Sequence, residues 1–319
     1  MTDEELERIA RGYRAFVDEA APSSPLYAEL AASVAQDEAS LRFLAALPVG
    51  KRQPNLLLAA VQYLGGAPAD GRELRKRVVE DGERLRATMT ARATQTNEPA
   101  RCAALLPVLA RLEGPLALIE VGASAGLCLY PDRYSYEYDG RPVGVRSPVH
   151  LACATTGGMP LPERLPEVTT RIGVDLNPLD ASDPDDRAWL LALIWPGPAA
   201  ADRLRRLDAA AEIAAREPAR MLTGDLLERL PEALDLVPAG STPVVFHTAV
   251  LPYVPRPHRA AFVELVRSLP VRWLAQEAPG VVPGTGEASP DGWGPDFVLS
   301  LDGRPLARTA PHGGRIDWL

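Results

Sequence analysis

The feature that most constrains the fold is a short apolar segment at Leu116–Val121, in which Glu120 is the only residue that is not apolar. Buried strands of parallel sheets have this composition because helices cover both of their faces. Small residues follow at once, in the order Gly122-Ala-Ser-Ala-Gly126. Such a loop lets a ligand approach the backbone and can point free N–H groups at it. The segment therefore predicts a central strand of an α/β sheet that ends at a candidate ligand loop.

Strand and helix patterns alternate along the rest of the chain. Strands are predicted at residues 172–176, 220–223, 243–247 and 271–275, and helices at residues 203–216 and 256–269. The last two strands, at residues 297–301 and 304–309, flank Asp302-Gly303, which is typical of a hairpin turn. We therefore expect an α/β fold, a Rossmann-like, doubly wound and mainly parallel sheet with an antiparallel last strand.

The chain before this sheet has a different pattern. Apolar residues recur at helical spacing from residue 3 to residue 112, and no strand pattern interrupts them. We predict an all-helical N-terminal domain at residues 1–114, interpreted as a substrate cap, and a Rossmann-like domain at residues 115–319. Alternating tyrosines before Asp139-Gly140 predict a hairpin insertion at about residues 128–170, beside the small-residue loop.

Charge and cysteine content limit the function classes. The chain has 34 Lys and Arg against 42 Asp and Glu, a net charge of −8, which disfavours nucleic acid because phosphates bind basic surfaces. Its three cysteines form no CxxC pair and no disulfide spacing pattern. The N-terminus is acidic, unlike a secretory signal, and no apolar run approaches the ~20 residues that span a bilayer. We expect a cytoplasmic protein with no nucleic-acid partner and no membrane partner.

Polar residues close four of the predicted strands, at Glu120, Asp175, Asp225 and His247. Ligands of open α/β sheets bind outside the carboxyl ends of the strands, so these side chains are candidates for one site. Asp175 is placed to accept from both hydroxyls of a ribose, and Asp225 to accept from the amino group of adenine. Either acid can instead be a helix N-cap.

These residues carry a resemblance to a known class of enzyme. Residues 116–309 resemble a class I S-adenosylmethionine-dependent methyltransferase domain in the segment Glu120–Gly126, in Asp175, in Gly224-Asp225 and in the reversed last strand. The resemblance implies S-adenosylmethionine (SAM) as cofactor and methyl transfer to a small molecule, and the Arg and amide side chains of Arg92–Arg101 indicate an anionic one. Its implied cofactor-binding residues are Glu120, Gly122, Ala123, Ser124, Gly126, Asp175, Asp225 and His247.

The whole chain, including Arg92–Asn97 and residues 120–127, also resembles an uncharacterised bacterial family known only as a domain of unknown function. This family brings no reaction with it. The chain departs from the methyltransferase pattern because Glu120 and Asp175 lie 175 − 120 = 55 residues apart, against about 20 in a plain dinucleotide-binding unit. The helix that normally follows the glycine-rich loop is therefore expected to be short or displaced.

Residue chemistry indicates further candidates. Guanidinium and amide groups can bind a carboxylate on the acceptor, although the same groups are often helix caps and surface ion pairs. The predicted substrate-binding residues are Arg92, Gln95, Asn97, Arg101, Asp132, Arg133, Tyr134 and His312. His247 and Tyr253 are the predicted catalytic bases, although a lone histidine is commonly structural. The four histidines lack a metal-like spacing, so we predict no metal.

Two other functions fit the sequence. The protein is then either a non-catalytic nucleotide- or ligand-binding protein, or a lyase or isomerase on the same fold, because a fold alone does not determine a reaction. Methyl transfer is preferred because the predicted pocket has polar residues beyond those that the cofactor needs. A hydrolase is disfavoured, since the sequence has no GxSxG nucleophile elbow.

Overall fold

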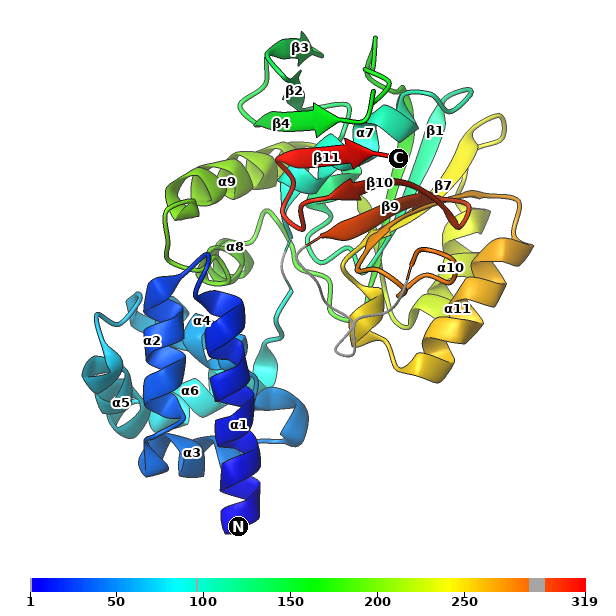
Figure 1. The fold of residues 1–319 in the computed structure, drawn as a ribbon. Helices are drawn as coiled ribbons and strands as arrows, with labels where there is room; N and C mark the ends of the chain where they lie inside the picture. Colours follow the sequence, from blue (N-terminus) through cyan, green and yellow to red (C-terminus); the bar gives the residue numbers. More distant parts are fainter. Residues whose placement is uncertain (1, 96, 287–295) are drawn as a thin grey trace. The chain divides into compact units, whose positions relative to one another are not determined.

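Figure 1 shows the computed structural model, which describes residues 2–95, 97–286 and 296–319. The chain forms two compact units. The helical unit comprises Met1–Thr96 and Asp183–Arg205, and the sheet unit comprises Asn97–Ser182 and Arg206–Leu319. The units differ from the predicted domains, 1–114 and 115–319, in the placement of two segments. Residues 97–114 fold with the sheet, and residues 183–205 fold with the helices.

The helical unit confirms the helical N-terminal region. Its helices are α1 (Asp3–Ala20), α2 (Pro25–Val34), α3 (Glu38–Ala45), α4 (Pro54–Gly65), α5 (Gly71–Glu80), α6 (Gly82–Ala91) and α8 (Pro184–Ala192), with the short 3-10 helix η1 (Val49–Lys51). Several begin at an N-cap side chain that accepts a first-turn N–H, as Ser24 does for α2 and Asp37 for α3. Among the helices of the described residues, none has both the length and the apolar character that crossing a membrane requires.

The sheet unit is a mixed α/β structure with a mostly parallel sheet. Its strands are β1 (Leu116–Val121), β2 (Ser135–Tyr138), β3 (Arg141–Val143), β4 (His150–Thr156), β5 (Val168–Asp175), β6 (Arg220–Thr223), β7 (Thr242–Thr248), β8 (Arg272–Glu277), β9 (Phe297–Leu301), β10 (Arg304–Thr309) and β11 (Arg315–Trp318). Within the described residues they form one sheet in the order β3-β2-β4-β11-β10-β9-β8-β7-β1-β5-β6. The five strands from β6 to β8 are parallel, and β9 reverses the direction.

The remaining helices of this unit are short or amphipathic. They are η2 (Pro99–Arg101), α7 (Cys102–Leu109), η3 (Leu127–Leu129), α10 (Leu226–Asp235), η4 (Leu251–Tyr253) and α11 (Arg256–Ser268), while α9 (Ala200–Arg216) continues from one unit into the other. All eight residues of α7 are buried, as expected of a helix that is apolar on every side. It contacts β4 and β9.

The predicted hairpin insertion is present as β2 and β3, which turn at Asp139 and Gly140 with positive φ angles of 49° and 79°. Its tyrosines are buried, and each hydroxyl donates to a backbone carbonyl. Tyr134 donates to Leu127, Tyr136 to Pro131 and Tyr138 to Ala103. The insertion therefore packs this tyrosine column against η3 and α7 and extends the sheet edge through β4.

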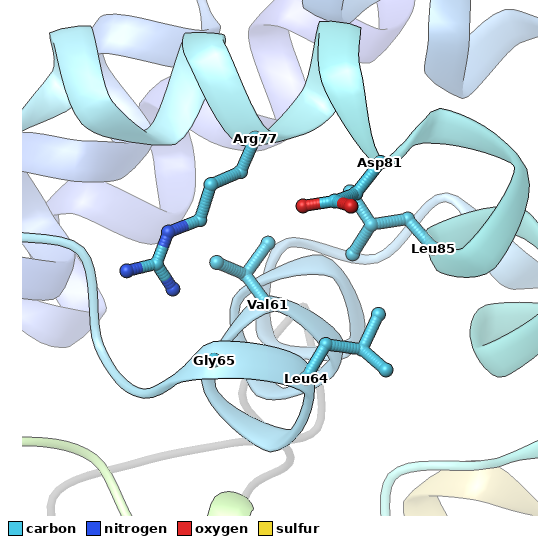
Figure 2. A pocket seen from close by; sticks show the side chains of 6 residues that line it. All are labelled: Val61, Leu64, Gly65, Arg77, Asp81 and Leu85. Carbon is cyan, nitrogen blue, oxygen red and sulfur yellow. The ribbon is translucent and has the colours of Figure 1, made fainter.

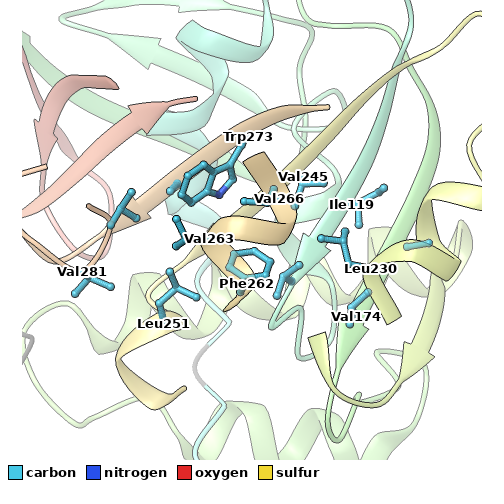
Figure 3. Packing of buried hydrophobic residues seen from close by; sticks show 14 of the residues in the cluster. Ile119, Val174, Leu230, Val245, Leu251, Phe262, Val263, Val266, Trp273 and Val281 are labelled. Atoms are coloured by element: carbon cyan, nitrogen blue, oxygen red, sulfur yellow. The ribbon is translucent and has the colours of Figure 1, made fainter. Parts of the chain in front are cut away.

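The two faces of the central strands differ. Side chains alternate along a strand, so Ile119 and Glu120 point to opposite faces. Figure 3 shows the apolar face, where Ile119 and Val245 pack under Leu230 of α10 and Phe262 of α11. We call the opposite side, on which Glu120 lies and which η2 approaches, the polar face. The carboxyl edge of this polar face holds the candidate site.

Candidate functional site

Gly122 begins the small-residue loop with a left-handed backbone, at a φ of 70°. A Cβ added there would lie 2.5 Å from a methyl carbon of Val250, in the segment that follows β7. Glycine is therefore required by the backbone conformation and by packing within the protein. The space directly over Gly122 is filled by Val250, so ligand contact is not needed to explain this residue.

The backbone N–H groups of the loop are bonded within the protein. Gly122 and Ala123 both donate to the carbonyl of Val174, at 2.8 and 3.2 Å, and Gly126 donates to Ala123 at 2.6 Å. The loop then enters η3, a three-residue 3-10 helix, instead of an α-helix. The expectation that the loop points free N–H groups at a ligand is wrong for these positions, because β5 and the loop itself supply their acceptors. A short following helix was predicted and is present.

Asp175 joins the end of β5 to this loop. One carboxylate oxygen accepts from the backbone N–H of Ser124 and the other from that of Asn177, both at 2.8 Å. Ser124 is buried in a left-handed conformation, whereas Asp175 is only half-buried and the next residue, Leu176, is 75% exposed. The ends of β1 and β5 are thus brought together, and the ribose role of Asp175 stays a prediction.

Asp225 follows β6 as the N-cap of α10, since its carboxylate accepts from the backbone N–H of Leu227 at 2.8 Å. Asp225 is therefore a helix N-cap, which is one of the two roles that the sequence allows. A contact between Asp225 and adenine stays a prediction.

Asn97 and Arg101 lie next to the loop and the strand ends. The Asn97 amide donates to the carbonyl of Ala123 at 3.1 Å and accepts from the backbone N–H of Leu127 at 2.8 Å. Asn97 therefore clamps the loop at both ends. Arg101 of η2 reaches the end of β7, where its Nη1 donates to the carbonyl and the hydroxyl of Thr248 at 2.9 and 3.2 Å.

Glu120 is 2% exposed, and its Oε2 atom has no hydrogen-bond partner among the described residues. Burial raises the pKa of this carboxyl well above its usual range, and the nearby Cys128 thiol adds to the effect. The positive charge of Arg101 acts in the opposite direction. A proton on Glu120 is therefore favoured over a buried negative charge.

Three further polar residues, which sequence analysis missed, continue this edge. Thr248 of β7 is level with Gln276 of β8, and the Gln276 amide donates to the hydroxyl of Thr309 on β10 at 2.8 Å. The Gln276 carbonyl oxygen is buried and has no partner among the described residues. A signal existed, because Gln276 and Glu277 end a predicted strand just as Asp175 and His247 do.

His247, predicted both to bind cofactor and to act as a base, lies on the apolar face and is fully buried. The Trp273 indole N–H donates to Nε2 at 3.0 Å, so Nδ1 carries the proton and donates to Glu277 Oε1 at 2.6 Å. That oxygen also accepts from the backbone N–H groups of Val250 and Leu251. Both ring nitrogens are therefore engaged in holding the segment after β7, and a catalytic role stays a prediction.

The other predicted catalytic residue, Tyr253, is 61% exposed at the end of η4. His312 is exposed on the loop between β10 and β11, whose neighbouring Pro311 carbonyl accepts from Arg101 Nε at 2.9 Å. His312 therefore directly follows Pro311, a hydrogen-bond partner of Arg101. Both roles stay predictions.

Asp132, Arg133 and Tyr134 lie on the segment between η3 and β2. Asp132 accepts from Arg133 and from the buried Arg171 of β5, both at 2.8 Å. Arg133 also forms a two-pronged pair with Glu217, at 2.8 and 2.9 Å, and this pair lowers the pKa of that carboxyl. These contacts anchor the displaced chain after η3 and give the three residues a structural explanation.

Arg92 and Gln95 belong to the helical unit. Arg92 pairs with Asp185 and Asp186 at the start of α8, and its guanidinium lies over the rings of Tyr63 and Trp189. Gln95 is half-buried. Among the described residues, the carboxylates of Asp183, Asp185 and Asp186 come within 4.8 Å of one another, and Arg92 already supplies a positive charge to two of them.

Two surface pockets lie away from these residues. Figure 2 shows one in the helical unit, where Arg77 and Asp81 stand over Val61 and Leu64 of α4. Its cavity volume is about 50 Å³, well below the ~300 Å³ of typical small-molecule pockets. The other is lined by Ala110, Arg111 and residues 160–164. Neither contains a predicted site residue, so the site is defined by its buried polar groups.

The chain belongs to the bacterial family described as "Uncharacterized protein conserved in bacteria (DUF2332)", whose model matches residues 10–318. The family assignment made from the sequence is therefore confirmed across both units. A comparison with curated proteins finds no significant match.

Proposed function

We propose that this protein is a SAM-dependent methyltransferase that acts on a small, anionic molecule, on a Rossmann-like fold. The supporting observation is the position of three acids in the order β6-β5-β1-β7-β8. The chain builds outward from β1 to β5 and β6, and then resumes on the other side at β7. Doubly wound sheets bind ligands at this reversal, and Glu120, Asp175 and Asp225 lie at or directly after the ends of β1, β5 and β6.

The residues present fit the cofactor in part. The unpartnered Oε2 of Glu120 is a buried acceptor for a donor on the ligand, and the half-buried carboxylate of Asp175 suits hydroxyl groups. Val250 covers Gly122, so the cofactor would contact Ser124 and Asp175 instead of the start of the loop. When bound, SAM supplies an electrophilic methyl group. The chain's own residues hold this cofactor and the acceptor in line, which is the main requirement of such a transfer.

The acceptor we propose needs no base at its reacting atom. Both nitrogens of His247 are occupied, and the ring is fully buried. The cationic Arg101 near Glu120 favours an acceptor that carries a negative group, because the net charge of −8 would otherwise repel it.

A calorimetric titration with SAM and with its demethylated product tests the proposal. We expect both to bind, and we expect Asp175→Asn to weaken binding by about 10- to 100-fold, as for the loss of a charge-assisted hydrogen bond. Glu212→Gln, on the exposed side of α9, is the matched control and should leave affinity unchanged. Failure of the folded wild-type protein to bind either ligand would reject the proposal.

A second candidate is a lyase or isomerase on the same fold. It is favoured by the buried and unpartnered Oε2 of Glu120, because burial raises the pKa of this carboxyl and a carboxyl with a raised pKa can act as a general acid or base. The two candidates differ in cofactor, so a protein that ignores SAM but loses its activity in Glu120→Gln supports the second. Binding of SAM without any transfer supports the remaining alternative, a non-catalytic ligand-binding protein.

A further inference from the structure

A pocket in the sheet unit is separate from the candidate site. It has a cavity volume of about 290 Å³ and is lined by Ala110, Arg111 and residues 160–164. This volume is close to the lower end of the range of small-molecule pockets, ~300–1,000 Å³. The lining combines two arginines and one glutamate with apolar residues. The pocket is therefore large enough for a small molecule and offers it both charged and apolar contacts.

The pocket lies where the chain approaches the amino ends of two central strands. Arg111 precedes β1, which begins at Leu116, and residues 160–164 precede β5, which begins at Val168. The Leu116 N–H donates to the carbonyl of Glu167 at 2.7 Å, which joins the two approaching segments. The candidate site begins after the other end of β1, six residues and about 20 Å further along the strand. The pocket therefore needs a ligand of its own.

Packing fixes the segment between β4 and β5 that forms most of the lining. A Cβ added at Gly157 would lie 1.9 Å from the carbonyl oxygen of Trp318, so this segment starts in close contact with the end of β11. A Cβ added at Gly144 would lie 3.0 Å from Leu165, so the segment is also packed near its end. Pro162, within the lining, is buried. A ligand therefore does not have to order this part of the pocket.

The charged side chains of the lining are unpaired. Among the described residues, the guanidinium groups of Arg111 and Arg164 have no hydrogen bond or ion pair, and Glu163 pairs with neither of them. Other arginines of the same unit do find carboxylates, as Arg133 and Arg171 show. Two cations against one anion leave the lining positive in a chain whose net charge is −8. Such a local charge favours an anionic ligand.

We propose that this pocket binds a small molecule that carries a phosphate group, with the phosphate on Arg111 and Arg164. A phosphate monoester has nearly two negative charges at pH 7 and three acceptor oxygens, so it can engage both guanidinium groups. A carboxylate has one charge and matches one of them. Pro160 and Leu161 offer apolar surface to the organic part of the ligand. The proposal does not depend on SAM or on methyl transfer.

Phenyl phosphate, inorganic phosphate and benzoate are the probes, because they separate the charge of the ligand from its ring. Each is titrated into the full-length protein by ligand-observed NMR. Phenyl phosphate should bind at least about tenfold more tightly than benzoate, since it brings a second charge and a third oxygen. It should also bind more tightly than inorganic phosphate, and equal binding of these two would reject the organic part of the ligand. Equal binding of phenyl phosphate and benzoate, or no binding of phenyl phosphate, overturns the proposal.

Three exposed side chains of the lining give predictions of opposite sign. Arg111→Gln and Arg164→Gln should each weaken phenyl phosphate binding by about tenfold, because each removes a charge-assisted hydrogen bond. Glu163→Gln should strengthen binding by about threefold, because it removes the negative charge of the described lining. Arg304→Gln, at an exposed arginine of β10, removes the same charge elsewhere and should have no effect. If it weakens binding as much as the lining variants do, the net charge attracts the phosphate and the pocket is not its site.

The second ionisation of the phosphate gives an independent measurement. A phosphate monoester gains its second charge at about pH 6, so phenyl phosphate should bind more tightly at pH 7.5 than at pH 5, whereas benzoate is a monoanion at both. Glu163 is the titratable carboxyl of the described lining, so the comparison is made in Glu163→Gln, where the ligand is the group that titrates. The gain should shrink when Arg164→Gln is added. An affinity that does not change with pH contradicts a site in which two arginines hold one dianion.

Discussion

The two faces of the central sheet pair their buried polar groups to different extents. On the apolar face, Trp273 donates to His247, His247 donates to Glu277, and the same Glu277 oxygen accepts two backbone N–H groups. On the polar face, Glu120 and Gln276 each keep an acceptor without a donor among the described residues. The second oxygen of Glu277, Oε2, also has no partner there, so the apolar face leaves one acceptor unpaired. Both sets are buried within the same unit, so solvent exposure does not explain the difference.

The difference separates groups that hold the structure from groups that do not. The series of hydrogen bonds from Trp273 through His247 to Glu277 fixes the segment after β7. This segment places Val250 over Gly122. The unpaired acceptors on the polar face stabilise nothing that the structure shows, and each has an energetic cost. A bound ligand or an ordered water that donates to these acceptors would offset this cost.

The largest loss of stability should come from truncating a large core side chain on the apolar face. Phe262 is fully buried and packs edge-on against His247 and Trp273. Phe262→Ala should lower the free energy of unfolding by about 3–5 kcal/mol, because the cavity forfeits both transfer energy and contacts. Urea unfolding monitored by circular dichroism measures the change. Val145→Ala, at a 73% exposed position, should change it by less than about 0.5 kcal/mol. A loss below about 1 kcal/mol in Phe262→Ala would show that this core repacks freely.

The sequence was sufficient to predict this face but not the other. Apolar runs such as Leu116–Val121 identify buried strands from local composition alone, and the hairpin at Asp302-Gly303 follows from turn chemistry. The row formed by Thr248, Gln276 and Thr309 depends on which strands become neighbours and in which register. No local pattern contains that information.

The same limit explains the outcome for His247. Every residue from Val244 to Thr248 is buried, and the residues of this segment show no polar and apolar alternation from which to tell the two faces apart. His247 shares a face with Val245 and Trp273, whereas Thr248 points to the polar face. Arg101 and Glu120 were predicted as separate site residues, and only the fold brings η2 to the strand ends.

A smaller effect should follow from removing a polar group that is fully paired. Asn97→Ala leaves the Ala123 carbonyl and the Leu127 N–H without their partners, and should cost about 2–3 kcal/mol. Asn97→Asp keeps the acceptor for Leu127 and should cost about half as much. Unfolding free energies of the two variants measure this. Equal losses would mean that the side-chain oxygen that accepts from Leu127 contributes nothing.

Trp273→Phe should have a smaller effect still. The ring volume is largely kept, but Nε2 of His247 loses its donor, so the free energy of unfolding should fall by about 1–2 kcal/mol. Nitrogen NMR of the His247 side chain should report a change at Nε2 while Nδ1 stays bonded to Glu277. An unchanged Nε2 resonance would contradict the proposed hydrogen-bond chain.

The effect of Glu120→Gln should depend on pH, and at pH 4 it should be the smallest of the four. Because burial raises the pKa of Glu120 in the folded protein, the protonated carboxyl contributes its full stability only below the unfolded pKa of about 4.3. That contribution is lost as pH rises through the folded pKa. The amide variant does not titrate, so the two proteins should be similarly stable at acidic pH, and the variant should gain on the wild type as pH rises. Urea unfolding at pH 4, 6 and 8 measures the difference, with Glu212→Gln as a surface control that should show no such trend. If Glu120→Gln were instead less stable at pH 8, Glu120 would be ionised and stabilised by the charge of Arg101, and its carboxylate would then not be an unsatisfied buried group.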